Sequence, residues 1–287
     1  MSDDGAKLGY IGLGNQGAPM AKRLLDWPGG LTVFDVLAEA MAPFAERGAR
    51  LAGSVADVAA ADVVSVTVLT DEQVRSVVAE LAKAARPGTV IAIHSTISET
   101  TAPELAEKHA AQGIHVIDAP VSGGAGAAEK GELATMVGAA RGVYDRVKPV
   151  FKLWASMVIH AGEPGAGTRM KLARNMLTFV SYAAACEAMR LAEAAGLSLQ
   201  ALGKVVRHSD SLTGGPGAIM VRDDMSVLGP DHWLHDAFTH TRGLGEKDLS
   251  LALALGESLD VDLPLAEIAL SNLAAGLGVP HPAPIKE

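Results

Sequence analysis

Three glycines near the N-terminus constrain the fold of this chain more than any other feature. Gly12, Gly14 and Gly17 form the pattern G-x-G-x-x-G directly after the apolar run Leu8–Ile11, and helical spacing follows. In a strand–turn–helix unit, the first glycine permits a tight turn, the second lets a pyrophosphate approach the backbone, and the third lets helix and strand pack closely. The positive N-terminal end of the helix favours the phosphates. The pattern therefore predicts a dinucleotide-binding unit.

A carboxylate follows where such a unit requires one. The second strand-like run, Thr32–Phe34, ends at Asp35, 18 residues after Gly17. A carboxylate there can accept hydrogen bonds from the adenosine ribose hydroxyls, and it would repel a 2′-phosphate. Asp35 therefore favours NAD over NADP. The alternative is that the glycines are ordinary turn residues and Asp35 is a solvated strand end.

Strand-like runs alternate with helical stretches through the first half of the chain. We expect further strands at 63–68, 90–93 and 114–117, and helices at 38–47, at 71–85 with Asp71 as its cap, and at 103–112. Strands this apolar are buried on both faces, and their alternation with helices predicts a parallel sheet. Beyond Gly165 there are only long stretches with helical spacing, among them 170–195 and 249–259. We predict an α/β Rossmann domain (a doubly wound parallel sheet) over residues 1–162, and an all-α domain over residues 163–287 joined to it by a long helix. The Pro-rich tail from Gly278 to Pro284 is expected to be irregular.

Composition excludes several classes of function. The 287 residues are 49% hydrophobic and 20% charged, which suits a folded core rather than disorder. The net charge is −9 without any Lys/Arg run, so we expect no nucleic-acid partner. The lone Cys186 cannot form an internal disulfide, the start is acidic, and the apolar run 176–186 is shorter than the about 20 residues of a membrane span. We expect a cytoplasmic protein without a membrane partner.

Two polar turns follow predicted strands, where ligands bind in open parallel sheets. Ser122, Gly123 and Gly124 offer backbone N–H groups and a hydroxyl, a suitable nest for a small carboxylate. A glycine-rich connection without a ligand fits that turn equally well. Ser95 and Thr96 follow the strand at 90–93, where their hydroxyls can contact cofactor or substrate. Capping of a helix is the alternative for this pair.

A lysine and an asparagine, four residues apart, lie early in the long predicted helix. Lys171 and Asn175 share one helix face. The flanking residues are expected to be buried, namely Met170, Leu172, Ala173, Met176 and Leu177. Burial and the positive helix N-terminus would both lower the pKa of Lys171, which would make it an effective proton donor near neutrality. A solvated surface lysine is the alternative.

The histidines near residue 235 do not form a recognisable metal motif. His232, His235 and His240, with Asp231 and Asp236 nearby, fit no strong zinc spacing. We expect a polar, partly solvated loop or helix there, and no metal.

Five segments together resemble the β-hydroxyacid dehydrogenase family, which includes the 3-hydroxyisobutyrate dehydrogenases and tartronate semialdehyde reductases. The similarity covers nearly the whole chain in the family's order. Its motifs are the cofactor motif at 12–21, the substrate motif at 118–124, the segment at 131–138, the catalytic motif at 162–175 and the Lys-Asp-Leu element at 247–252.

The resemblance implies roles for individual residues. Lys171 is then the catalytic acid/base, and Asn175 holds the substrate oxygen or Lys171. Ser122, Gly123 and Gly124 hold the substrate carboxylate, while Thr96 lines the cleft and Lys247 reaches towards nicotinamide and substrate. The loop that binds NAD is made of Gly12, Leu13, Gly14, Asn15, Gln16 and Gly17, with Asp35. The family transfers a hydride between the cofactor and a β-hydroxy acid or its semialdehyde, and it assembles as homodimers or homotetramers.

Three positions depart from the family pattern. Gln16 replaces a usual Met, and His240 stands where Phe is common. Asp35-Val36-Leu37 replaces the Asn-Arg-Thr of the NADPH-dependent glyoxylate and succinic semialdehyde reductases, which strengthens the preference for NAD.

Four other functions remain as alternatives. A semialdehyde reductase relative is one of them. An imine-reductase-like enzyme would place another residue at Lys171, and a decarboxylating 6-phosphogluconate dehydrogenase would be much longer. A non-catalytic NAD-binding module would not need Lys171, Asn175 and Ser122 together.

Overall fold

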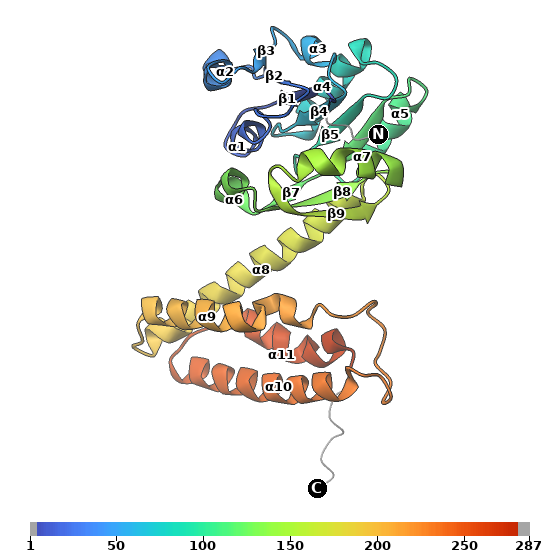
Figure 1. Cartoon of the computed structure of the whole chain (residues 1–287). Coiled ribbons are helices and arrows are strands. Elements are labelled where there is room, and N and C mark those ends of the chain that lie inside the picture. Colours follow the sequence, from blue (N-terminus) through green and yellow to red (C-terminus); the bar gives the residue numbers. More distant parts are fainter. Residues whose placement is uncertain (1–4, 281–287) are drawn as a thin grey trace. The chain divides into compact units, whose positions relative to one another are not determined.

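A computed structural model describes residues 5–280 of the chain (Figure 1). The chain divides into two compact units, Met1–Arg174 and Asn175–Glu287. The division falls inside one long helix, α8 (Ala166–Ala194), whose first two turns belong to the N-terminal unit.

The N-terminal unit begins as a doubly wound parallel sheet (Figure 1). Its strands run parallel in the order β3-β2-β1-β4-β5-β6, and the order reverses between β1 and β4, where such sheets bind ligands. This confirms the predicted Rossmann fold. The elements are β1 (Leu8–Ile11), α1 (Gly17–Lys22), β2 (Leu31–Phe34), α2 (Ala38–Ala45), β3 (Arg50–Leu51), α3 (Val55–Val58), β4 (Val63–Val66), α4 (Asp71–Ala84), β5 (Val90–Ile93), α5 (Thr101–Ala110) and β6 (His115–Asp118).

Burial on both faces explains why the central strands are mostly apolar. All four residues of β1, of β4 and of β5 are buried. Neighbouring residues in a strand point to opposite faces, so Tyr10 packs in one apolar layer with Met20 and Trp154, while Ile11 packs in the other with Leu81.

The sheet continues beyond β6 in a mixed arrangement that the sequence did not indicate. The added elements are β7 (Val121–Ser122), α6 (Gly124–Lys130), β8 (Leu133–Gly138), α7 (Arg141–Phe151) and β9 (Ala155–Gly162). Strand β8 is antiparallel to β6 and β7 and parallel to β9. The parallel arrangement is therefore correct for β1 to β6 and incomplete for the whole sheet.

One expected helix cap is wrong. Thr70, not Asp71, caps α4: its hydroxyl accepts a hydrogen bond from the Gln73 amide in a capping box. Asp71 instead accepts hydrogen bonds from the Ser98 amide and the Thr101 hydroxyl, and so ties the start of α4 to the start of α5.

The described part of the C-terminal unit, up to residue 280, consists of helices and the segments that connect them. It contains the rest of α8, then α9 (Leu199–Thr213), the short 3₁₀ helix η1 (Gly215–Ile219), α10 (His235–Ser258) and α11 (Pro264–Leu277), and α10 packs against α11. The stretch expected at 249–259 is the second half of α10. Helix α11 ends at Leu277, with Gly278 as its C-cap. The rest of the Pro-rich tail, from residue 281, lies outside the described residues. Between residues 5 and 280, no helix has the length and apolar character needed to cross a membrane.

Candidate active site

The three glycines of the first loop have different surroundings. A Cβ on Gly12, whose φ is +91°, would lie 2.0 Å from the Thr67 carbonyl oxygen, and a Cβ on Gly17 would lie 1.9 Å from the Gly12 carbonyl oxygen. A Cβ on Gly14 would meet nothing within 4 Å. Two of the glycines are thus required by the fold, and the third leaves open space beside the backbone, where a ligand can approach.

Asp35 lies directly against this loop. Its carboxylate accepts hydrogen bonds from the Leu13 amide (2.6 Å) and the Leu37 amide (2.9 Å), which fixes the glycine loop to the end of β2. The side chain is only half-buried, so it can also accept hydrogen bonds from a ligand.

The loop also holds a polar group that lacks a partner. The buried Gln16 Nε2 has no hydrogen-bond partner within the described residues, and Gln16 is the residue immediately before α1. Buried donors are normally satisfied, so this amide is suited to an acceptor from outside the chain. Together with the open space at Gly14 and the helix N-terminus, it fits the pyrophosphate of a dinucleotide.

The two neighbouring residues of the turn after β5, Ser95 and Thr96, have different surroundings in the structure. Ser95 is buried, and its hydroxyl accepts from the Val68 amide (3.0 Å) and donates to the Val68 carbonyl (2.6 Å). Ser95 therefore does not cap a helix, and its hydroxyl is already engaged by Val68. Thr96, the next residue, is exposed at the carboxyl end of the sheet.

The Ser-Gly-Gly turn lies after the neighbouring strand. Ser122 is half-buried, while Gly123 and Gly124 are exposed, with φ values of +132° and +74° that other residues rarely adopt. They lead into α6. Since β5 and β6 are parallel neighbours, Thr96 and this turn follow strand ends at the same edge of the sheet.

Lys171 is buried, although not for the expected reason. Its exposed fraction is 8%, whereas the flanking Met170, Leu172 and Met176 are 39%, 40% and 66% exposed. The prediction of buried flanks is therefore wrong, because only the face of α8 that lies on the sheet is covered. Burial lowers the pKa of the Lys171 ammonium, and the charge of Arg174, one turn further on, lowers it further.

Asp118, to which the sequence motifs assign no role of its own, anchors the start of α8. Asp118, the last residue of β6, is completely buried, and its two carboxylate oxygens accept hydrogen bonds from the Gly165 and Thr168 amides, each at 2.6 Å. The only signal in the sequence is its place in the motif at 118–124. Its partners lie 47 and 50 residues away, too far for a local pattern to reveal them.

The remaining two predicted site residues belong to the C-terminal unit. Asn175 is half-buried, one turn beyond Lys171 on α8. Lys247, on α10, is exposed and forms an ion pair with Asp248 (3.1 Å). The structure thus gathers the glycine loop, Asp35, Thr96, the Ser-Gly-Gly turn and Lys171 in the N-terminal unit, and the approach of Lys247 to them stays a prediction.

The histidines near the start of α10 belong to the C-terminal unit. His235 is the first residue of α10 and contacts Asp236 (3.1 Å), while His232 stacks on Trp233. Throughout residues 5–280, no three His, Cys, Asp or Glu side chains are grouped so as to hold a metal ion.

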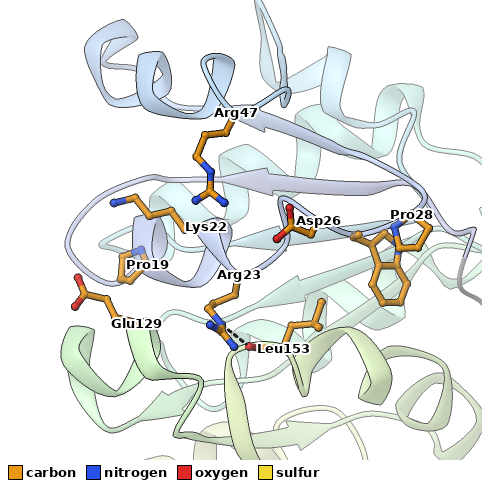
Figure 2. A pocket seen from close by; sticks show the side chains of 9 residues that line it. Pro19, Lys22, Arg23, Asp26, Pro28, Arg47, Glu129 and Leu153 are labelled. Carbon is orange, nitrogen blue, oxygen red and sulfur yellow. Dashed lines mark hydrogen bonds between the residues drawn. The ribbon is translucent and has the colours of Figure 1, made fainter.

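A pocket of about 570 Å³ lies at the other end of α1 (Figure 2). It holds three cationic side chains (Lys22, Arg23 and Arg47) and two carboxylates (Asp26 and Glu129), and Arg23 donates to the Leu153 carbonyl (2.8 Å). A pyrophosphate is expected at the N-terminus of α1, whereas this pocket borders its C-terminal end. It is therefore not part of the candidate active site.

Comparisons with known proteins agree with this geometry. Residues 7–162 match the family model of the NAD binding domain of 6-phosphogluconate dehydrogenase. Residues 165–278 match the model described as NAD-binding of NADP-dependent 3-hydroxyisobutyrate dehydrogenase.

Individual relatives cover nearly the full chain. An uncharacterized oxidoreductase of Mycobacterium tuberculosis is 70% identical over 98% of this chain and 97% of its own length. A crystal structure from Mycobacterium avium 104, described only as an oxidoreductase, is 74% identical with a TM-score of 0.94, over 96% of this chain and 100% of that one. The 3-hydroxyisobutyrate dehydrogenase of M. tuberculosis, solved with L-serine, is 34% identical with a TM-score of 0.67, over 94% and 92% of the two chains.

Proposed function

The chain belongs to the β-hydroxyacid dehydrogenase family, and we propose that it is an NAD-dependent dehydrogenase that interconverts a β-hydroxy acid like 3-hydroxyisobutyrate and its semialdehyde. As a member of this family it is an oxidoreductase that uses a nicotinamide dinucleotide. The observation that carries the proposal is a buried lysine with a lowered pKa, held at the ligand-binding edge of a dinucleotide-binding sheet.

Each side chain has a defined task in this reaction. NAD, when bound, would accept the hydride from the carbon that bears the hydroxyl. In oxidation Lys171 takes the hydroxyl proton as the carbonyl forms, and in reduction it returns that proton to the carbonyl oxygen. Asn175 holds the same oxygen or the lysine. The hydroxyl of Ser122 and the N–H groups of Gly123 and Gly124 hold the substrate carboxylate.

The glycine loop and Asp35 are assigned to the cofactor. The loop amides from Leu13 to Gly17 and the orphan amide of Gln16 bind the pyrophosphate, and Asp35 accepts hydrogen bonds from the ribose. Thr96 and Lys247 contact the nicotinamide half. Asp35 carries the preference for NAD, because its charge disfavours the 2′-phosphate of NADP.

The domain boundary and the location of the protein are also proposals. We place the boundary after residue 162, where the two family-model matches meet, although the compact units divide later because the first turns of α8 lie on the sheet. We place the enzyme in the cytoplasm.

We propose that the enzyme is a homodimer or homotetramer. Helix α8 exposes Met176, Phe179 and Tyr182 by 66%, 63% and 62%, which is unusual for large apolar side chains outside an interface. Analytical ultracentrifugation should give two or four times the 29.5 kDa chain mass, and a monomer at micromolar concentration would contradict this.

Replacement of the lysine tests the proposed function directly. Lys171→Ala should lower kcat by about 10²- to 10⁴-fold, the usual contribution of general acid–base catalysis, while the dissociation constant for NAD stays the same. Lys152→Ala, at an exposed lysine after α7, is the matched control and should behave like the wild type.

A substrate screen tests the proposed reaction class. The compounds to screen with NAD and NADP are 3-hydroxyisobutyrate, serine, glycerate, tartronate semialdehyde and bulkier analogues. NAD binding without turnover of any of them would favour a non-catalytic module, and turnover of imines alone would favour an imine reductase.

A further inference from the structure

We infer that Asp118 is the positioning residue for Lys171: its carboxylate fixes the first turn of α8 to the sheet, and so determines where the reacting amine stands. This inference rests on the proposed function. It gives a role in catalysis to a side chain that does not reach the substrate.

The burial of Asp118 excludes direct contact with a ligand. The side chain has no exposed surface, and each of its oxygens is engaged by a different backbone amide of the α8 start, Gly165 or Thr168, at 2.6 Å. Such lengths are typical of hydrogen bonds to a charged acceptor, which are roughly twice as strong as neutral ones. The carboxylate also lies at the positive end of the helix dipole.

Two glycines bring the helix backbone onto the strand backbone at this point. A Cβ on Gly138 would lie 2.2 Å from Asp118 Oδ1 and 2.9 Å from the Gly167 amide nitrogen. A Cβ on Gly167 would lie 2.2 Å from the Met136 carbonyl oxygen. No side chain separates helix from strand here, so the anchored turn has little room for a second position.

Lys171 follows the anchored turn closely. It lies three residues after Thr168, which corresponds to about 4.5 Å along the helix axis. A tilt of the first turn therefore moves the amine directly. A misplacement of about 1 Å at a reacting group can cost about 10²-fold in rate.

The chain contains a natural control for this arrangement. Glu187 is 5% exposed and accepts hydrogen bonds from the Leu265 and Ala266 amides at the start of α11. It has the same chemistry as Asp118, a buried carboxylate that holds a helix start from a distance. The helix that it holds carries none of the proposed catalytic groups.

Three variants separate positioning from stability. Asp118→Asn leaves one of the two helix amides without its acceptor, Gly138→Ala keeps the charge and pushes against the carboxylate, and Glu187→Gln weakens the other helix anchor. For Asp118→Asn and Gly138→Ala we expect kcat per folded enzyme to fall about 10²-fold, with KM and the NAD dissociation constant changed less than about 3-fold. Glu187→Gln should unfold at lower denaturant concentration and keep its kcat.

Amide hydrogen exchange gives a reading that does not depend on turnover. In Asp118→Asn, the amides of residues 165–171 should exchange faster than in the wild type, while the glycine loop remains protected. Unchanged kcat per folded enzyme in both Asp118→Asn and Gly138→Ala would overturn the inference and leave Asp118 as a structural cap. If the wild type turns over none of the hydroxy acids, the proposed function fails. Exchange alone then decides: faster exchange confined to 165–171 supports the positioning role, and unchanged exchange overturns it.

Discussion

Burial lowers the pKa of Lys171, which favours the neutral amine that the proposed oxidation needs. A surface lysine is almost fully protonated at neutral pH, whereas the covered Lys171 ammonium has a lowered pKa, and Arg174 contributes to the shift. Both causes act by penalising the charged form. In the reaction proposed above, this shift increases the share of neutral amine, the form that acts as the base in oxidation.

The pH dependence of the rate should follow from this shift. Oxidation needs the neutral amine, so kcat/KM should rise with pH and level off below the ordinary lysine pKa of 10.5. Reduction needs the ammonium, so its rate should fall through the same pH range. Arg174→Gln removes a repelling charge and should move both limbs to higher pH, which initial-rate profiles in the two directions would measure. Limbs that stay in place or move to lower pH would contradict the effect of Arg174.

Replacement of Asp35 should alter the choice of cofactor. Asp35→Ser removes the charge and both amide contacts, and should erode NAD/NADP discrimination by at least about tenfold, equivalent to about 1.4 kcal/mol. Asp35→Asn keeps an acceptor for the Leu13 amide and isolates the contribution of the charge. The dissociation constants of both cofactors are the measurement. Discrimination that is unchanged in both variants would show that another residue selects the cofactor.

Sequence patterns indicate features whose geometry is local, and they miss contacts between residues that are far apart in the chain. The glycine loop and Asp35 are recognisable because their spacing along the chain is itself the geometric requirement. The burial of Lys171 depends on a helix start clamped by a residue more than 40 positions earlier, so its apolar neighbours gave the wrong reason for it. Ser95 and Thr96 look equivalent in sequence, and only the fold shows which of the two is free to meet a ligand.

At the scale of elements, two glycines of the unit β1–loop–α1 should have different roles: Gly17 in the fold and Gly14 in the proposed binding of NAD. Gly14→Ala places its Cβ in open space, so the variant should unfold like the wild type and bind NAD about tenfold more weakly or worse. Gly17→Ala places its Cβ 1.9 Å from the Gly12 carbonyl oxygen, so it should lower the midpoint of thermal unfolding. Thermal melts and NAD titrations distinguish the two. Equal loss of stability in both variants would contradict this assignment.

Five strands were predictable from short, mostly apolar runs, and in three of them, β1, β4 and β5, every residue is buried. The five are β1, β2, β4, β5 and β6. Strand β7 has only two residues, and β9 is largely uncovered, so neither carries that signal. The antiparallel addition of β8 brings Gly138 beside Asp118, which is the contact that local patterns could not reveal.

At the scale of the whole molecule, one buried histidine should make stability depend on pH. His94 contacts the Ala119 carbonyl (2.7 Å) and the Ser65 hydroxyl (3.0 Å), and so links the ends of β4, β5 and β6. Burial lowers its pKa from 6.5 to about 4, although the contact with Ala119 acts in the opposite sense.

Between pH 6.5 and about 4, His94 should therefore bind a proton in the unfolded chain and stay neutral in the folded chain. Above pH 6.5 His94 is neutral in both states, and between pH 6.5 and about 4 the free energy of unfolding should fall by about 3 kcal/mol from this group. Urea unfolding at pH 7.5, 6 and 5 measures the slope. His94→Gln, although less stable throughout, should lose this part of the pH dependence, and an unchanged slope in that variant would assign the effect to other groups.

At Gly138 and Gly167 the backbones of β8 and α8 touch without a side chain between them, and this bears on how the substrate preference of such an enzyme can change in evolution. Because close backbone packing and the buried Asp118 carboxylate together hold the start of α8, exchanges among outward-facing side chains should leave the position of Lys171 unchanged. New substrates can then be accommodated by substitutions at exposed positions, while the proposed proton-transfer residue Lys171 keeps its place.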